Sequence, residues 1–386
     1  MKKQLILGLA ILASVVSCTT DDTSDIVINS TTNNTTGGGT TDPQTIFLSG
    51  TYTEDLTLDA NNTYKINGSL IMASGTTLTI PACMTIEALA SGANVYVAIS
   101  QGAKIVANGT ANCPIVLTSD ASNPQPGDWG GLILLGQAPI NSVTGTATAT
   151  SEIANLPYGG NVANDNSGSL NYVRVEYSGG AADGQSENNG FSFYGVGSGT
   201  IVNYIQAYAG KDDGIEFFGG TVNASYISVI NAEDDSVDWT EGFSGTLNHV
   251  YISNRATDDK AIEADGYNTD FSNATGMFSK PTVNNVTIIG EGSANSSEAV
   301  RLRAGTQGIF NNIMITGYAE GFDLDDLDTG NGVVSDDLQV TGVTFVDVID
   351  FVKNDTTITF TDADFYTGEG TATGTDYATW GAGWTF

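Results

Sequence analysis

Short runs of alternating apolar and polar residues fill the chain from about residue 46 onward. Examples are Leu78-Thr79-Ile80, Val95-Tyr96-Val97 and Ile115-Val116-Leu117. Alternation with a period of two is typical of β-strands, and no segment after residue 17 has a convincing apolar period of 3.6 residues. The pattern predicts an all-β fold.

Between residues 170 and 345 these runs become a repeat, with several intervals of 22 or 23 residues. One strand of the repeat has an alternating apolar core after a polar residue, and its copies start at Asn171, Asn203, Ser225, Asn248, Asn284 and Asn311. A second strand is centred on Glu216, Asp238, Glu263, Arg301 and Asp323. Units this short cannot bury an apolar face alone and must stack on their neighbours. We therefore predict one right-handed parallel β-helix, a solenoid, over residues 46–386.

The register of the first strand predicts three columns along the solenoid. The apolar column that should point inward is Val173, Ile205, Ile227, Val250, Val286 and Ile313. The preceding Asn residues should hydrogen-bond to one another at a bend. Between them, Tyr172, Tyr204, Tyr226 and His249 form a ring column that either stacks on itself or offers flat faces to sugars. His249 fits a wall residue better than a ligand or a base.

Two segments depart from the repeat. Residues 137–168 lack strand alternation and are expected to form one long lateral excursion. Residues 356–386 are both aromatic and polar and end in Trp380-Gly-Ala-Gly-Trp384. Because a solenoid needs covered ends, we assign residues 356–386 as a C-terminal cap.

The N-terminus resembles the signal of a bacterial lipoprotein. Lys2 and Lys3 precede a short apolar run, and Val15-Val16-Ser17-Cys18 resembles a lipobox. The resemblance implies a signal peptide at residues 1–17 and lipid attachment at Cys18; the alternative is an ordinary signal peptide that contains a cysteine. Thr19 stands where an inner-membrane retention signal would have Asp, which favours the outer membrane, and Thr20-Asp21-Asp22 resembles the surface-export signal of Bacteroidota.

Residues 18–45 are rich in Thr, Asn, Asp and Gly and poor in apolar side chains, so we expect a disordered tether. The two remaining cysteines, Cys83 and Cys113, are an even pair in an exported protein and a candidate disulfide. Two buried free thiols are the alternative.

Several sequence segments of the chain are similar to segments in a family of exported Bacteroidota β-helix proteins. They are Ile105-Val-Ala-Asn-Gly-Thr110, Gly127-Asp-Trp-Gly-Gly-Leu-Ile-Leu-Leu-Gly136, Ser167-Gly-Ser-Leu-Asn-Tyr-Val-Arg-Val-Glu-Tyr177, Asp213-Gly-Ile-Glu-Phe-Phe-Gly-Gly220 and the Trp380 to Trp384 ending. The resemblance implies the β-helix fold and a location at the cell surface. That family has no agreed activity.

The charge balance narrows the possible partners. The chain has 12 basic and 44 acidic side chains and a formal net charge of -32. This charge repels phosphate, so nucleic acid and bare anionic lipid are poor partners. With 40% apolar residues the chain nevertheless has enough material for a large core.

Three acidic pairs recur at one place in successive units: Asp212 and Asp213, Asp234 and Asp235, Asp258 and Asp259. Stacked carboxylates repel one another and attract a cation, and calcium suits such oxygen-rich sites. The alternative is that each Asp only caps a turn. The acidic segment 323–330 partly resembles a calcium-binding loop, but the spacing of its acids matches no standard calcium-binding motif.

The column of Glu216, Asp238, Glu263, Arg301 and Asp323 should face outward, because it alternates with inward apolar residues. Glu216 and Asp238 would suit a glycosidase, and Arg301 or Arg303 a polysaccharide lyase. The chain lacks the His and Lys residues that most β-helix enzymes of these two classes use. It also has no phosphate-binding loop and no zinc motif. We therefore expect a rigid binding or scaffold element at the cell surface, toward a glycan or an outer-membrane protein. The alternatives are a carbohydrate-active enzyme on the acidic face and a subunit of an outer-membrane complex.

Overall fold

The computed structural model describes residues 42–182 and 187–386. The predicted signal peptide, Cys18 and the tether up to residue 41 lie outside the described residues. Among the described residues, no helix is long and apolar enough to cross a membrane. The first strand of the described residues is β1, whose first residue is Thr45.

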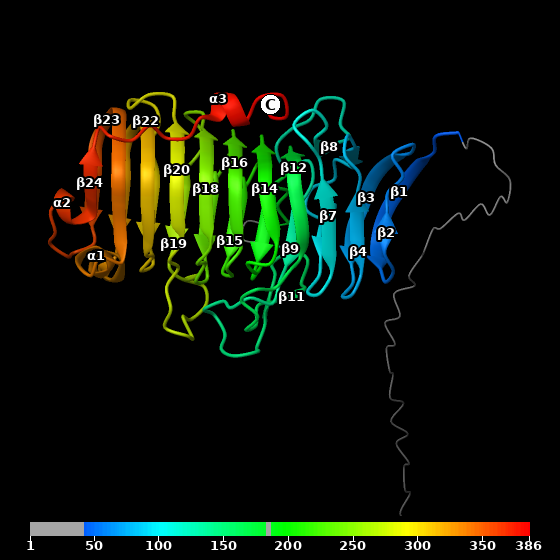
Figure 1. The fold of residues 1–386 in the computed structure, drawn as a ribbon, viewed down its shortest axis with the longest axis horizontal. Coiled ribbons are helices and arrows are strands. Elements are labelled where there is room, and N and C mark those ends of the chain that lie inside the picture. The colour runs from blue at the N-terminus through cyan, green and yellow to red at the C-terminus, as the bar shows by residue number, and fades with distance from the viewer. Residues whose placement is uncertain (1–41, 183–186) are drawn as a thin grey trace, which may run out of the picture. The chain divides into compact units, whose positions relative to one another are not determined.

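The predicted right-handed parallel β-helix is confirmed (Figure 1). Each coil contributes a strand to a long face and a strand to a short face. Four coils show this plainly: on the long face Val173, Ile205, Ile227 and Val250 align in parallel register. On the short face Ile215, Val237 and Ile262 do the same.

The first coils are built from β1 (Thr45–Tyr52), β2 (Leu56–Thr57), β3 (Thr63–Met72), β4 (Thr77–Ile80), β5 (Thr85–Ala88), β7 (Lys104–Asn108) and β8 (Ile115–Ser119). The long face continues with β12 (Gly168–Glu176), β14 (Ile201–Tyr208), β16 (Asn223–Ile230), β18 (Thr246–Ser253), β20 (Thr282–Ile289) and β24 (Tyr366–Glu369). The short face contains β6 (Tyr96–Ile99), β9 (Leu132–Leu135), β13 (Phe191–Tyr194), β15 (Ile215–Phe218), β17 (Val237–Thr240), β19 (Ile262–Asp265) and β21 (Glu298–Arg303). β22 (Gly308–Asp325) and β23 (Leu338–Asp355) run through both faces.

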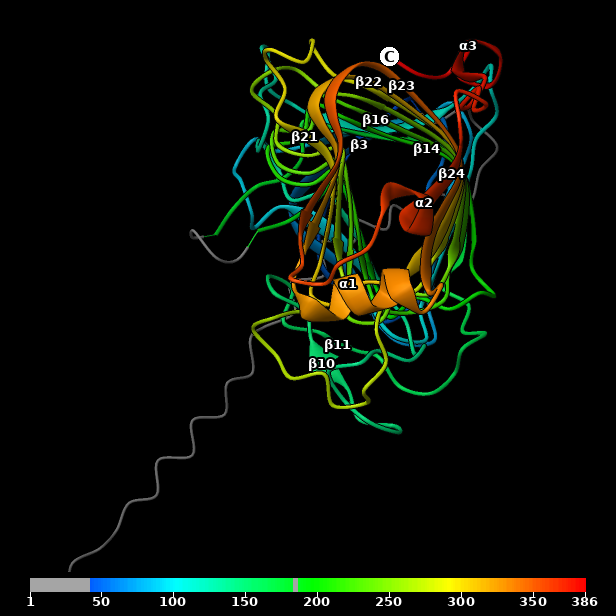
Figure 2. The same cartoon turned by 90° about the vertical axis from the view of Figure 1, so that its left-hand side faces the viewer.

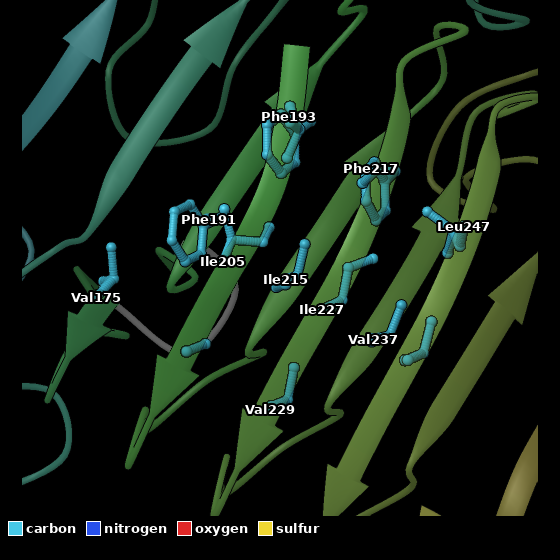
Figure 3. Close-up of a cluster of buried hydrophobic side chains, with 14 of the residues drawn as sticks. Val175, Phe191, Phe193, Ile205, Ile215, Phe217, Ile227, Val229, Val237 and Leu247 are labelled. Carbon is cyan, nitrogen blue, oxygen red and sulfur yellow. The ribbon is translucent and has the colours of Figure 1, made fainter. Parts of the chain in front are cut away.

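Inward side chains from both faces fill one continuous core. Figure 3 shows Phe191, Phe193 and Phe217 of the short face in one buried cluster with Ile205 and Ile227 of the long face. Most of these side chains are fully buried, and the dominant stabilisation comes from this apolar area removed from water. The residues that the repeat predicted to point inward are all in this core.

Each long-face strand bends at the ring column. Tyr172, Tyr204, Tyr226 and His249 have φ between 50° and 62°, so the bend passes through a left-handed residue directly after the Asn or, in one coil, after Ser225. In the first coils the bend is a longer insert, and Cys83 and Cys113 lie in two such inserts on neighbouring coils. They are joined by a disulfide in the structure. The Asn column is hydrogen-bonded in part: Nδ2 of Asn311 donates to Oδ1 of Asn284 over 2.9 Å.

The C-terminal residues lie in two places, which differs from the single cap expected at 356–386. Helix α2 (Asp362–Phe365) lies over the open end of the last coil, and helix α1 (Leu327–Val334) connects β22 to β23 along one side of that end (Figure 2). After β24 the chain leaves that end and runs back along the outside of the long face, through α3 (Tyr377–Trp380), as far as β12 (Figure 1). We call residues 371–386 the C-terminal strap.

The strap covers the ring column. Tyr172 stacks on Tyr204 and Tyr204 on Tyr226, with ring centroids 4.2 Å apart in both pairs. Trp384 packs edge-on against Tyr172 at 5.5 Å and is fully buried. His249 stacks on Tyr226, and its Nδ1 lies 3.1 Å from Oγ1 of Thr375. Of the two interpretations of the ring column, the structure therefore favours stacking within the protein.

The lateral excursion folds back onto the outside of the short face. It contains the two-stranded antiparallel pair β10 (Ala149–Thr150) and β11 (Pro157–Tyr158). Tyr158 is buried in a second apolar cluster with Tyr194 and Phe218, outside the main core. Through this cluster the excursion forms one wall of the site described next.

Candidate functional site: an acidic pocket

A cavity of about 370 Å³ lies over the outward side of β15, β17 and β19. We call it the acidic pocket, because ten of its thirteen lining residues are carboxylic acids. The lining residues are Glu152, Glu187, Asn189, Asp212, Asp213, Glu216, Asp234, Asp235, Asp238, Asp259, Lys260, Glu263 and Arg303.

The stacking of coils brings these acids together in columns. Asp212, Asp234 and Asp259 each lie three residues before the first aligned strand residue of their coil, so they form one column. In the next column, the backbone N–H of Asp235 donates to Oδ1 of Asp213 at 3.0 Å. The backbone N–H of Lys260 donates to Oδ1 of Asp235 at 2.9 Å. Turn capping by Asp therefore occurs here, but it uses only one oxygen of each carboxylate.

Asp258 does not belong to the pocket, so the predicted pairing of Asp258 with Asp259 is wrong by one residue. The turn before β19 is two residues longer than the turns before β15 and β17, which shifts the register. Asp259 takes the first position of the pair and Lys260 the second, while Asp258 forms an ion pair with Arg255 at 2.7 Å.

The second predicted column points away from the core as expected, but it is not a free outer face. Glu216, Asp238 and Glu263 project into the pocket, and Glu263 is only 7% exposed. Glu152 from the excursion and Glu187 from the loop before β13 complete the enclosure. Nδ2 of Asn189 donates to Oε2 of Glu216 at 2.7 Å.

Enclosure makes the carboxylates hard to ionise. Burial is the main cause, and neighbouring carboxylates add to it. Together they raise the pKa of Asp212 to about 9. Burial, with Glu152 and Asp212 nearby, raises the pKa of Glu216 well above its usual range. Burial, with Glu216 and Glu263 nearby, does the same to the pKa of Asp238.

Two cationic side chains meet the carboxylates at one end of the pocket. Nζ of Lys260 lies 2.6 Å from Oδ2 of Asp259 and 3.3 Å from Oε1 of Glu263. Nη2 of Arg303 lies 2.5 Å from Oε2 of Glu263, and its Nε lies 2.6 Å from Oδ1 of Asp265. Two cations cannot neutralise ten acids, so most acids in the pocket have no counter-charge from the described residues.

The carboxylates are close enough to share metal ions. Several trios have oxygens within 4.8 Å of one another, including Glu187, Asp212 and Asp234; Asp213, Asp234 and Asp235; Asp213, Glu216 and Asp238; and Asp235, Asp238 and Glu263. Oxygens bound to one calcium ion at 2.3–2.6 Å can be up to about 5 Å apart, so these spacings fit calcium. Oδ1 of Asp238 is buried and accepts no hydrogen bond from the described residues, which leaves it available to an ion or a water molecule.

The family comparison agrees with this architecture. Residues 50–385 match the family model described as a pectate-lyase-like β-helix domain. The chain belongs to this family. No curated protein and no solved structure gives a significant match to the chain.

Within this pectate-lyase-like β-helix, the two arginines considered for a lyase are held in ion pairs. Burial opposes the charge of Arg303, but Asp265 and Glu263 raise its pKa above the ordinary value. Arg301 lies outside the pocket, where its Nη2 is 2.7 Å from Oδ2 of Asp325. A guanidinium held protonated by carboxylates is a poor proton acceptor, so the geometry disfavours arginine as a catalytic base.

The remaining sequence candidates have other places. Asp323 is buried on β22 beside Glu298 and Glu320, outside the acidic pocket. The segment that looked like a calcium loop contains a helix cap, because Oδ1 of Asp326 accepts the backbone N–H groups of Asp328 and Thr329 at the start of α1.

Sequence reasoning missed Glu152, Glu187 and Asn189, which lie in irregular segments outside the repeat. It also missed Glu241, a fully buried acid in the adjoining cavity of about 170 Å³. The carboxylate of Glu241 accepts the hydroxyl of Tyr158 at 2.9 Å, and burial raises its pKa to about 7. The repeat pattern does not indicate that Glu241 is buried next to aromatic residues.

Proposed function

We propose that this chain is a lipid-anchored outer-membrane protein whose pectate-lyase-like β-helix is a cell-surface binding element for glycans, with calcium held in the acidic pocket. The observation that carries the proposal is the concentration of ten carboxylates in one cavity with only two cations to balance them.

Electrostatics supports calcium as the occupant. Ionised carboxylates a few ångströms apart repel strongly near a low-dielectric wall, and a divalent cation turns that repulsion into attraction. The pocket offers only oxygen ligands, apart from Lys260 and Arg303. Calcium takes six to eight oxygens in flexible geometry, which this crowded but irregular set can supply in part.

A glycan is the partner class that fits such a site. Three or four carboxylates leave part of the calcium coordination sphere open, and sugar hydroxyl or carboxylate groups can fill it. The adjoining cavity adds Asn268, Asp270 and the exposed ring of Phe271 as further contacts for a sugar. Lipid attachment at Cys18 and the acidic export signal would place this site at the cell exterior, as in the Bacteroidota proteins that the sequence resembles.

The test is a glycan array probed with the protein without its signal peptide, once with calcium and once with EGTA. We expect binding to a restricted set of polysaccharides in calcium only. The double variant Glu216→Gln/Asp238→Asn should lose that binding, while Asp350→Asn, an exposed acid on β23, should keep it. Equal binding by wild type and the double variant would remove the acidic pocket from the function.

An enzyme is the second candidate, favoured by carboxylates with raised pKa values that lie side by side. Glu216 and Asp238 would then act as acid and base of a glycosidase. Incubation with plant and algal polysaccharides and assay of new reducing ends distinguishes the two. Release of reducing ends that Glu216→Gln or Asp238→Asn abolishes would establish catalysis and contradict a purely binding role.

The third candidate is a subunit of an outer-membrane complex. Only the proposed cell-surface location favours it. Affinity purification from membranes would then give a partner protein in stoichiometric amount.

A further inference from the structure

A second cluster of acids lies in the last coils, apart from the acidic pocket. Glu298 of β21, Glu320 of β22 and Asp323 of β22 have carboxylate oxygens within 4.8 Å of one another. None of the three lines the acidic pocket. The register explains the proximity, because Glu298 is aligned with Glu320, and Asp323 is on the same strand three residues later.

The side chain of Asp323 indicates that this cluster lacks a bound partner. It is 3% exposed, and its Oδ1 is buried without a hydrogen-bond partner among the described residues. A buried carboxylate oxygen without a partner is costly, and a bound ion or water molecule removes that cost. The carboxyl group of Glu298 is within hydrogen-bonding reach of Asp323, but it is itself an acid and supplies no donor when ionised.

The protein supplies too little positive charge to balance this cluster. Nζ of Lys353 is 3.4 Å from Oε2 of Glu320 and 3.5 Å from Oδ2 of Asp323. The same ammonium group also contacts Asp355 at 3.5 Å. Arg301 approaches Glu298 only to 4.0 Å and is mainly paired with Asp325. One shared lysine therefore faces three carboxylates.

We infer that Glu298, Glu320 and Asp323 form a second divalent-cation site, of the calcium class, that joins β21 to β22 near the C-terminal end of the solenoid. Oxygen-only ligands at these spacings suit calcium. The ion would cross-link two coils close to the point where coil stacking ends and α1 and α2 take over. Its role is structural, and it does not depend on the function proposed for the acidic pocket.

The test counts calcium bound to the protein without its signal peptide, after EGTA treatment and dialysis against calcium. The background is Glu216→Gln/Asp238→Asn, which weakens the acidic pocket and isolates the second site. Adding Glu320→Gln should lower the count by about one ion per chain. Glu320 is chosen because it is more exposed than Asp323 and less critical for packing. The matched control is Asp350→Asn, which is aligned with Glu320 on the next strand and is exposed, and it should leave the count unchanged.

Hydrogen exchange of the wild-type protein is a second measurement that needs no variant. Calcium should slow amide exchange in residues 298–303 and 320–325 separately from any effect on residues 212–240. An unchanged ion count in the Glu320→Gln variant, or equal exchange of 298–303 and 320–325 with calcium and with EGTA, would overturn the second site. Three carboxylates that share a proton would then explain the cluster.

Discussion

At the residue scale, the acids of this protein differ from ordinary surface acids because the fold encloses them. Glu241 is the clearest case: it is fully buried, and within the described part of the chain its carboxylate accepts hydrogen bonds from the hydroxyl groups of Tyr158 and Ser142. Burial raises its pKa to about 7 from an ordinary value of 4.5. The folded state therefore holds a proton on Glu241 that the unfolded chain releases at lower pH.

The sign of this linkage predicts the behaviour of Glu241→Gln. Because the pKa is raised on folding, ionisation of Glu241 destabilises the folded protein as pH rises from about 4.5 through about 7. Gln resembles the protonated acid, so the variant should match wild type at pH 5. At pH 9 it should have a free energy of unfolding higher by roughly 3 kcal/mol. Urea denaturation at both pH values measures this, with exposed Glu54→Gln as the control. A variant that is less stable than wild type at pH 9 would contradict the assigned burial cost.

The residue scale is also where the sequence was least informative. The repeat identified Asp213, Asp235 and Glu216 because their spacing follows the coil length. It could not identify Glu152 or Glu187, which reach the pocket through loops of irregular length. It assigned Asp258 to the column because Asp258 and Asp259 form an acidic pair like the other two. The two extra residues in the turn before β19, which shift the register, are not visible from the pairs alone.

At the element scale, the strands follow from the sequence and the C-terminal strap does not. Alternation and the 22-residue spacing depend on local side-chain patterns, which the coil geometry repeats. The aromatic residues of the strap carry no such period, so the sequence indicated only that they cover something. The structure shows that they cover the ring column of the long face, where Nη1 of Arg174 donates to the carbonyl oxygen of Trp384 at 3.0 Å.

Removing Trp384 should therefore release the strap. Trp384→Ala leaves a cavity where a fully buried ring contacts Tyr172 and Tyr204, a loss of about 3–5 kcal/mol. We expect a lower melting temperature and faster amide exchange in β12 and β14, with little change in β1 and β3. Phe47→Ala removes an exposed ring from β1 and serves as the control. Unchanged exchange in β12 and β14 would mean that the strap contributes little to the long face.

At the scale of the whole molecule, the raised pKa values act together. Burial is the first cause in each case. It raises the pKa of Asp212 to about 9, with Glu187 adding to the effect, and that of Asp265 to about 6 against the opposing charge of Arg303. In each case the folded state binds more protons than the unfolded state over the shifted range, so stability falls as pH rises. The net charge of -32 adds general repulsion in the same direction.

Calcium should reverse this trend, because a divalent cation takes the place of the bound protons. In EGTA, the melting temperature should fall steadily between pH 5 and pH 9. In millimolar calcium the fall should be much smaller over the same range. Scanning fluorimetry across pH under both conditions checks this. Parallel curves in calcium and EGTA would show that protons and calcium do not compete for the same carboxylates.

The most direct test of the acidic pocket is calorimetric titration of calcium into the EGTA-treated protein, with its melting temperature measured before and after. The account predicts saturable calcium binding and a rise of several degrees in wild type, and a clear loss of both in Glu216→Gln/Asp238→Asn. No heat of binding and an unchanged melting temperature in wild type would contradict it.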